Sequence, residues 1–142
     1  MIVLSGKEVF SWMNDCERLQ LRVQGTSMSP FLRDREDSVV LIKPEKIRKG
    51  DIIVFERNGY YIMHRVISIK DGFVDTLGDN LITPETDIPV GNVIAVVSTV
   101  VRNGKEIDNK SIVWNFYSKV YIHPVIRKII KKMRRKVNEN KR

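Results

Sequence analysis

Short runs in which apolar and polar residues alternate fill the middle of the chain. In LQLRVQG, Leu19, Leu21 and Val23 alternate with polar residues, which is the period of two of a half-buried β-strand. Further β-rich runs follow as SVVLIK, IIVFER, YYIMHRVISIK, FVDTLGD and GNVIAVVSTVVRNGKEID. Many short strands of this kind predict a mainly β fold.

Residue pairs that suit tight turns separate several of these runs. Both members of such a pair tolerate the positive φ that a two-residue hairpin turn requires. The pairs are Asn58-Gly59, Asp71-Gly72 and Asn103-Gly104. They predict antiparallel neighbours in a partly closed sheet. The segment 80–89, which is rich in Thr, Pro and Asp, is predicted to be a loop.

Spacings of three and four residues replace the alternation at both ends and predict helices. Residues 6–19 form a short amphipathic pattern with Val9, Phe10, Met13 and Cys16 on one face and Ser5 as a possible cap. From about residue 115, a second pattern gathers apolar residues on one face: Ile122, Ile126, Ile129, Ile130, Met133 and Val137. We therefore expect a β domain over residues 1–114, including the helix 6–19, and a basic amphipathic helix over residues 115–142.

Positive charge is concentrated in this C-terminal helix. The 142-residue chain has a net charge of +8, and residues 119–142 contain ten of its 25 Lys and Arg but only one of its 17 Asp and Glu. The segment 119–142 is compatible with docking on an anionic membrane surface or with covering the β domain through its apolar face. Binding to nucleic acid is the third alternative, disfavoured because no helix-turn-helix or aromatic stacking pattern is present.

Composition also excludes several classes of protein. Cys16 is the single cysteine, so no internal disulfide forms and no zinc-ligand spacing exists. The longest apolar run, residues 93–101, is too short to cross a bilayer. The N-terminus acquires charged residues too early for a secretory signal. We expect a protein without metal or organic cofactor that faces the cytoplasm, with the tail at the inner face of the membrane.

A serine and a histidine are the best candidates for chemistry. The turn QGTSMSPFL contains Ser27 and Ser29, and a serine nucleophile needs a base within hydrogen-bond reach. Ser29 precedes Pro30, a position biased toward extended geometry. Of the two histidines, His64 lies in a strand pattern that fixes its side chain on one sheet face, whereas His123 lies in the basic tail. Ser27 and His64 are therefore the expected pair.

Four successive segments resemble the motifs of type I signal peptidases with a histidine base. They are GTSMSPFL, KGDIIVF, HRVISI, and LGDN followed by DIPV. That branch includes archaeal, endoplasmic-reticulum and some bacterial enzymes, and it shares a superfamily with LexA-like self-cleaving repressors. The resemblance covers roughly residues 23–97. It implies that Ser27 is the nucleophile, that His64 is the general base, and that the Ser27 backbone N–H is an oxyanion donor.

The acid that orients His64 is left open by the same resemblance. In the histidine branch this acid stands just before a Pro-Val, which selects Asp87 in TDIPV. The interval from Asp79 to Asp87 is about two residues longer than is usual in the branch. Asp79, the acid of the Gly-Asp-Asn motif, and Glu85 therefore remain alternatives.

The resulting hypothesis is a serine endopeptidase that cleaves extended precursor or signal peptides after small residues. It departs from the family in lacking the transmembrane anchor that normally precedes the serine motif. A self-cleaving LexA-like module is the first alternative, although such proteins use lysine at the position of His64, carry a DNA-binding domain and cut an Ala-Gly bond that is missing here. A non-catalytic β domain that binds peptide or membrane is the second.

Overall fold

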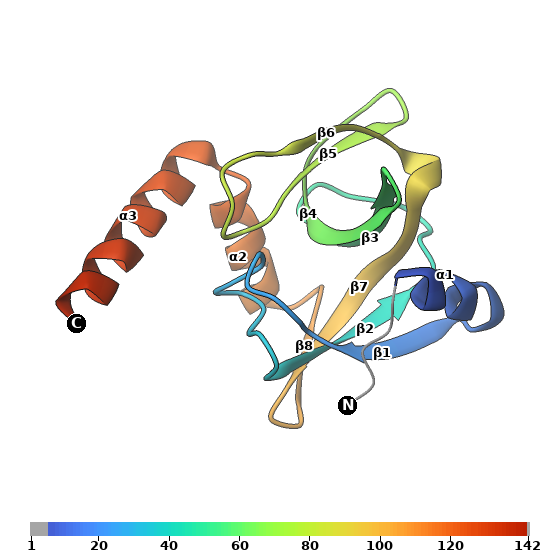
Figure 1. Cartoon of the computed structure of the whole chain (residues 1–142), viewed down its shortest axis with the longest axis horizontal. Coiled ribbons are helices and arrows are strands. Elements are labelled where there is room, and N and C mark those ends of the chain that lie inside the picture. The colour runs from blue at the N-terminus through green and yellow to red at the C-terminus, as the bar shows by residue number, and fades with distance from the viewer. Residues whose placement is uncertain (1–5, 142) are drawn as a thin grey trace.

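The computed structural model describes residues 6–141 and confirms the mainly antiparallel β fold (Figure 1). The strands are β1 (Arg18–Arg22), β2 (Asp37–Ile42), β3 (Ile52–Arg57), β4 (Tyr60–Lys70), β5 (Phe73–Leu77), β6 (Glu85–Pro89), β7 (Val93–Arg102) and β8 (Lys105–Asp108). The helices are α1 (Gly6–Asp15), α2 (Ile112–Tyr121) and α3 (Pro124–Asn140), with a 3-10 turn over Val90–Asn92.

One sheet contains all eight described strands. Its order is β1-β2-β7-β3-β4-β5-β6, with β8 paired to β7, and every pairing is antiparallel. The sheet curls, and Figure 1 shows β3 to β6 wrapped above the long strand β7. Asn58, Asp71 and Asn103 have φ between 51° and 52°, and each precedes a glycine with positive φ. The three predicted hairpin turns are thus confirmed.

Two apolar clusters lie on opposite faces of the curled sheet. The first joins the serine-containing turn to the C-terminal half, because Phe31 packs edge to face on Trp114 with ring centroids 5.1 Å apart. The second fills the concave region around Phe55, Val66 and Ile88. On β4, Met63 contacts the first cluster and Ile62 the second, as alternation along a strand requires.

The N-terminal helix is shorter than its sequence pattern predicts. It ends at Asp15, because Arg18 and Leu19 already pair with Ile42 and Leu41 of β2. Met13 is buried as expected, whereas Cys16 is exposed rather than part of the apolar face. The predicted cap Ser5 lies outside the described residues.

The C-terminal tail also differs from the prediction of one helix beginning near residue 115. It forms two helices, and α2 begins at Ile112, where Ser111 accepts a hydrogen bond from the Trp114 N–H. The predicted domain boundary therefore falls inside a helix that belongs to the core through Trp114 and Tyr121. Helix α3 then leaves the sheet (Figure 1), and most of its apolar residues are exposed, whereas Ile130 is half-buried. Within residues 6–141, every helix is too short or too polar to span a bilayer.

Candidate active site

Ser27 lies in a turn that is stabilised by hydrogen bonds of the neighbouring residues and by the burial of Met28. Gly25 opens the turn with φ of 89°, a value that L side chains rarely adopt, and its N–H donates to Asp34 Oδ1 at 2.8 Å. The Ser29 N–H donates to the Thr26 carbonyl at 3.0 Å. Met28 is buried, whereas Ser27 itself is half-buried. The buried methionine thus fixes the turn while leaving the hydroxyl of Ser27 accessible.

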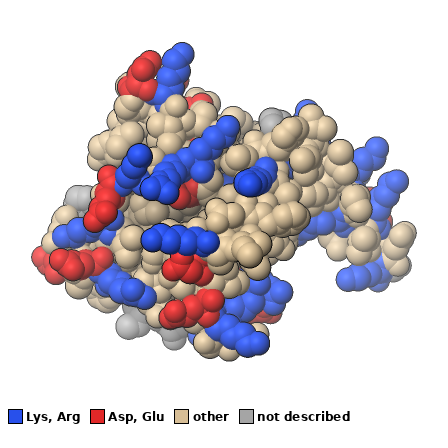
Figure 2. Space-filling view, turned by 180° about the vertical axis from the view of Figure 1, so that it is seen from behind, with Lys and Arg blue, Asp and Glu red and all other residues tan. Residues whose placement is uncertain are grey.

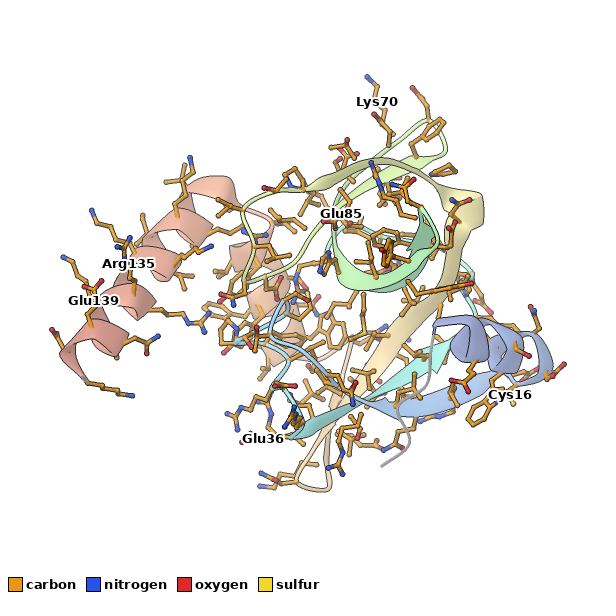
Figure 3. All side chains as sticks on the ribbon, in the orientation of Figure 1. Cys16, Glu36, Lys70, Glu85, Arg135 and Glu139 are labelled. Carbon is orange, nitrogen blue, oxygen red and sulfur yellow. The ribbon has the colours of Figure 1, made fainter. Side chains whose placement is uncertain are left out.

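His64 is placed by three adjacent strands. Thr76 on β5 faces Val66 on β4 and Glu85 on β6, and Val66 lies two residues beyond His64. Because side chains alternate along a strand, His64, Thr76 and Glu85 share one face. His64 Nδ1 lies 2.6 Å from Glu85 Oε1, and Thr76 Oγ1 donates to the same oxygen at 2.7 Å. Figure 3 labels Glu85, the first residue of β6.

This contact fixes which ring nitrogen of His64 is free. A carboxylate only accepts hydrogen bonds, so Nδ1 carries the hydrogen that binds Glu85 and Nε2 of the neutral ring keeps its lone pair. The ring is buried, with 6% of the residue exposed. His64 is therefore held in the tautomer that can accept a proton at Nε2.

Gly78 separates Ser27 from His64 Nε2. A Cβ atom on Gly78 would lie 2.8 Å from the Ser27 carbonyl oxygen and 3.0 Å from His64 Nε2. Ser27 and His64 thus flank the same glycine, and only a residue without a side chain fits between them. The next residues reinforce the approach, because Asn80 donates its N–H to the Ser27 carbonyl at 2.9 Å and its side-chain amide to the Thr26 carbonyl at 3.2 Å.

Asp79 does not contact His64, contrary to one of the sequence alternatives. Its two carboxylate oxygens each accept a hydrogen bond at 2.8 Å from Arg65, and both side chains are fully buried. Arg65 follows His64 on β4 and therefore points to the other face of the strand. Asp79 serves the structure of the loop that contains Gly78 and Asn80.

Asp87, the acid preferred from the sequence, is also displaced from His64. Strands β5 and β6 change register between Val74 and Thr76, so that β6 carries an extra residue at this point. Asp87 lies at this bulge and has a positive φ of 55°. Its side chain is exposed, and its backbone N–H donates to Asp75 Oδ1 at 2.8 Å. The bulge therefore brings Glu85, the last of the three sequence alternatives, opposite the histidine.

The Glu85 carboxylate is stabilised in its charged form. Its partial burial alone would raise the pKa of Glu85, but the hydrogen bonds from His64 and Thr76, together with the nearby positive charges of His64 and Arg57, lower this pKa overall. The carboxylate is charged at neutral pH and can balance a proton on the imidazole.

Arg127 of α3 also binds the loop that contains Gly78, a contact that no sequence pattern predicted. The residue is only 8% exposed and donates to the carbonyl oxygens of Gly78 at 2.5 Å and Leu81 at 2.8 Å. Burial lowers the pKa of Arg127, although the nearby Asp79 opposes this change. Arg134 adds longer contacts to the Ser29 carbonyl and to Asn80 Oδ1, both at 3.5 Å.

The described residues contain no group of His, Cys, Asp and Glu that could hold a metal ion. The groups that meet around Gly78 are the serine turn and the His64 imidazole, which is bound to the Glu85 carboxylate. An antiparallel β domain that sets a serine turn beside a strand-borne histidine and its carboxylate has the architecture of a serine peptidase.

Comparison with known families agrees with this class. Residues 9–101 match the Peptidase S24-like family, and the chain therefore belongs to that family. The family includes signal peptidases and LexA-like self-cleaving repressors. The matched segment contains Ser27, His64 and Glu85 and ends before α2. A comparison with curated proteins found no match.

Replacing Asp79 should affect folding. Asp79→Asn removes the negative charge that faces Arg65, and loss of one partner of a buried ion pair costs about 3–5 kcal/mol of unfolding free energy. Urea denaturation followed by circular dichroism measures this loss. The exposed Asp87→Asn variant is the matched control, with an expected change within about 0.5 kcal/mol. Equal midpoints for the two variants would contradict a structural role for Asp79.

The titration of Glu85 tests the contact with His64. The pKa of its carboxyl should lie below the ordinary value of 4.5, and His64→Ala should raise it by removing a hydrogen bond and a nearby positive charge. Stability linked to this lowered pKa is complete above the unfolded-state value and is lost as pH falls through the folded-state value. Carboxyl NMR titration of both proteins measures the change. An unchanged Glu85 midpoint in His64→Ala would show that the pair does not form in solution.

Proposed function

We propose that this protein is a serine endopeptidase of the signal peptidase type, with Ser27 as nucleophile, His64 as general base and Glu85 as the carboxylate that orients the base. One observation supports this proposal above all others. Glu85 binds Nδ1 of His64 and leaves Nε2 directed to the glycine that also touches Ser27. This arrangement supports the succession of acid, base and nucleophile on which serine peptidases depend, with Glu85 next to His64 and His64 near the turn of Ser27.

The reaction proceeds in two halves. Ser27 Oγ forms a bond to the carbonyl carbon of the peptide while its proton passes to His64 Nε2, and Glu85 stabilises the resulting imidazolium. The imidazolium then gives the proton to the leaving amine as the C–N bond breaks. Water attacks the acyl-enzyme while His64 Nε2 accepts its proton. The imidazolium then returns this proton to Ser27 Oγ as the ester C–O bond breaks and the acid product leaves.

The oxyanion is stabilised by a backbone donor in the serine turn. The N–H of Ser27 donates to no other residue within 6–141, so it is available to the negative oxygen that develops on the carbonyl. Ser27 Oγ has no hydrogen bond within this part of the chain either. Without bound substrate, catalytic hydrogen bonds are often long and tighten when the peptide enters.

The substrate proposed by likeness to signal peptidases is an extended segment of a precursor, with small residues before the cut. Self-cleavage of the LexA type is the alternative within the same family. The two differ in their product, because self-cleavage shortens this chain whereas an endopeptidase leaves it intact and shortens another peptide. Mass spectrometry of the protein incubated with and without peptides therefore separates them.

Replacement of the two serines of the turn tests the nucleophile. Ser27→Ala should abolish both peptide cleavage and labelling by a serine-directed acylating probe, because it removes the attacking oxygen. Ser29→Ala is the matched control and should keep most of both, since Ser29 lies two residues away and its hydroxyl donates to the Leu32 carbonyl at 3.4 Å. Peptide mapping after labelling should place the acyl group on Ser27. Labelling of Ser29 would disprove the assignment.

Replacement of the acids tests the orientation of His64. Glu85→Gln should lower kcat on the order of ten-thousand-fold, because a neutral amide no longer enforces the tautomer with a free Nε2. Asp87→Asn should leave kcat nearly unchanged, since Asp87 is exposed and held by Asp75. Steady-state cleavage of one peptide by both variants decides the matter, and a larger loss in Asp87→Asn would exclude Glu85 as the orienting acid.

Gly78→Ala tests the close approach of Ser27 and His64. The added Cβ must displace the Ser27 carbonyl, His64 or Leu81, and a shift of about 1 Å at a catalytic group can cost about a hundredfold in rate. Gly91→Ala is the control, because its Cβ would meet no atom within 4 Å. Because the displaced atoms also cost Gly78→Ala some stability, kcat is compared at a temperature at which circular dichroism shows both variants to be folded. Full activity of Gly78→Ala would mean that the site has another arrangement.

A further inference from the structure

Helix α3 contacts the β domain mainly through charged residues and the half-buried Ile130, and it exposes most of its other apolar residues. Arg127 is 8% exposed, whereas Ile129 is 53% and Met133 is 61% exposed. Four exposed apolar residues recur at spacings of three and four and form one stripe along the helix. This surface, called the α3 stripe below, consists of Ile126, Ile129, Met133 and Val137.

The basic edge of α3 lies beside this stripe and accounts for the contact with the domain. Arg127, Lys131 and Arg134 also recur at spacings of four and three, and they donate to carbonyl and amide oxygens of the loops that contain Gly78, Asn80 and Ser29. Since these bonds fix the helix on its basic edge, the stripe remains at the surface. Four of the six residues of the predicted apolar face are thus exposed, which disagrees with the sequence alternative in which that face covers the β domain.

Positive charge also continues along the other flank of the helix. Lys128, Lys132 and Lys136 are spaced by four residues and are exposed. The only acid of the segment 119–142, Glu139, is paired with Arg135 at 3.2 Å. Figure 2 shows the Lys and Arg side chains gathered on the protruding helix, with uncharged atoms between them.

We propose that α3 docks on the surface of an anionic lipid bilayer, with the α3 stripe among the acyl chains near the headgroups and the flanking lysines at the phosphates. An apolar stripe between rows of lysine and arginine is the pattern of helices that lie in the membrane interface. A second copy of the chain is a poorer occupant, because pairing two stripes would bring two strongly basic helices together. Nucleic acid would use the charges but leave the stripe in water.

Docking in this way would place the catalytic residues close to the membrane. The basic edge that touches the Gly78 and Ser29 loops lies on the same helix as the stripe, and a helix with its side chains is about 10–12 Å across. This consequence, which rests on the proposed peptidase function, restricts substrates to precursor segments that reach the bilayer surface. The docking itself does not depend on catalysis.

Vesicle binding by the intact protein tests the proposal. The chain should sediment with vesicles that contain phosphatidylglycerol, bind phosphatidylcholine vesicles far more weakly, and lose affinity as salt is added. Each basic residue near an anionic surface contributes about fivefold to affinity, so Lys132→Glu combined with Lys136→Glu should weaken binding by about 25-fold or more. Ile129→Glu combined with Met133→Glu should weaken it by at least about tenfold.

Controls separate docking from folding and from self-association. Ile69→Glu replaces an exposed isoleucine on β4 and should bind vesicles like the parent protein. Circular dichroism should be unchanged in all variants, since the replaced residues are exposed. Binding of the stripe variant equal to that of Ile69→Glu would overturn the proposal. Vesicle binding absent from the parent protein, with a dimer in sedimentation that the stripe variant dissolves, would also overturn it.

Labelling of Ser27 by the acylating probe distinguishes the two proposals. The stripe variant should retain labelling in solution while losing vesicle binding, because its substitutions lie on the exposed side of α3. Vesicle binding without labelling in the parent protein would reject the peptidase and keep the docking surface. Labelling without vesicle binding would reject the docking surface and keep the peptidase.

Discussion

The buried ion pair between Arg65 and Asp79 is the constraint on which the candidate site depends. Besides its two bonds to Asp79, Arg65 donates to the Gly50 carbonyl at 3.0 Å and to Ser118 Oγ at 2.8 Å. Its guanidinium also lies over the ring of Phe31, 5.0 Å from the centroid. One cation therefore connects β4, the Gly-Asp-Asn loop, helix α2 and the serine turn.

This arrangement explains why so costly a group is buried beside the site. A buried ion pair rarely adds net stability, since desolvation cancels most of its attraction, but it strongly penalises any arrangement in which one partner is lost. Asp79 follows Gly78 directly, so its bonds to Arg65 also hold Gly78 beside His64 and Ser27. Gly50 is part of the same constraint, because a Cβ at this position would lie 3.1 Å from Ser118 Cβ. The ion pair thus helps to fix the relative positions of Ser27 and His64, since catalytic groups must lie within about 0.5 Å of their productive geometry.

Local pattern predicted most of the sheet but failed at its edge. Alternation and Asn-Gly or Asp-Gly pairs located β2 to β5 and the β7–β8 hairpin, since these elements depend on neighbouring residues. Strand β6 was predicted to be a loop because Pro84, Thr86 and Asp87 are typical of turns. The strand forms nevertheless at the end of the sheet order, where Pro89 and a bulge are tolerated.

The same failure explains why the sequence preferred the wrong carboxylate for the contact with His64. Counting residues from a Pro-Val assumes a regular chain, whereas the bulge changes which side chain faces the histidine. The Ser27 and His64 assignment did not depend on this count, because the serine turn and the β4 pattern each identify their residue locally. Only the register of β5 and β6 distinguishes Glu85 from Asp87.

Helix α3 shows a second limit of sequence patterns. The spacing of its apolar residues correctly predicts a helix with one apolar face, but it does not predict what that face contacts. A stripe of isoleucine and methionine ordinarily predicts contact with the core. Here the carbonyl oxygens of Gly78 and Leu81, in the loop between β5 and β6, need donors. The buried Arg127 supplies them, which no apolar side chain could do. Because successive helical residues are rotated by about 100°, a helix that directs Arg127 toward the loop directs the α3 stripe toward the molecular surface. The position of the Gly78 loop and the exposure of the α3 stripe thus both follow from which edge of α3 contacts the domain.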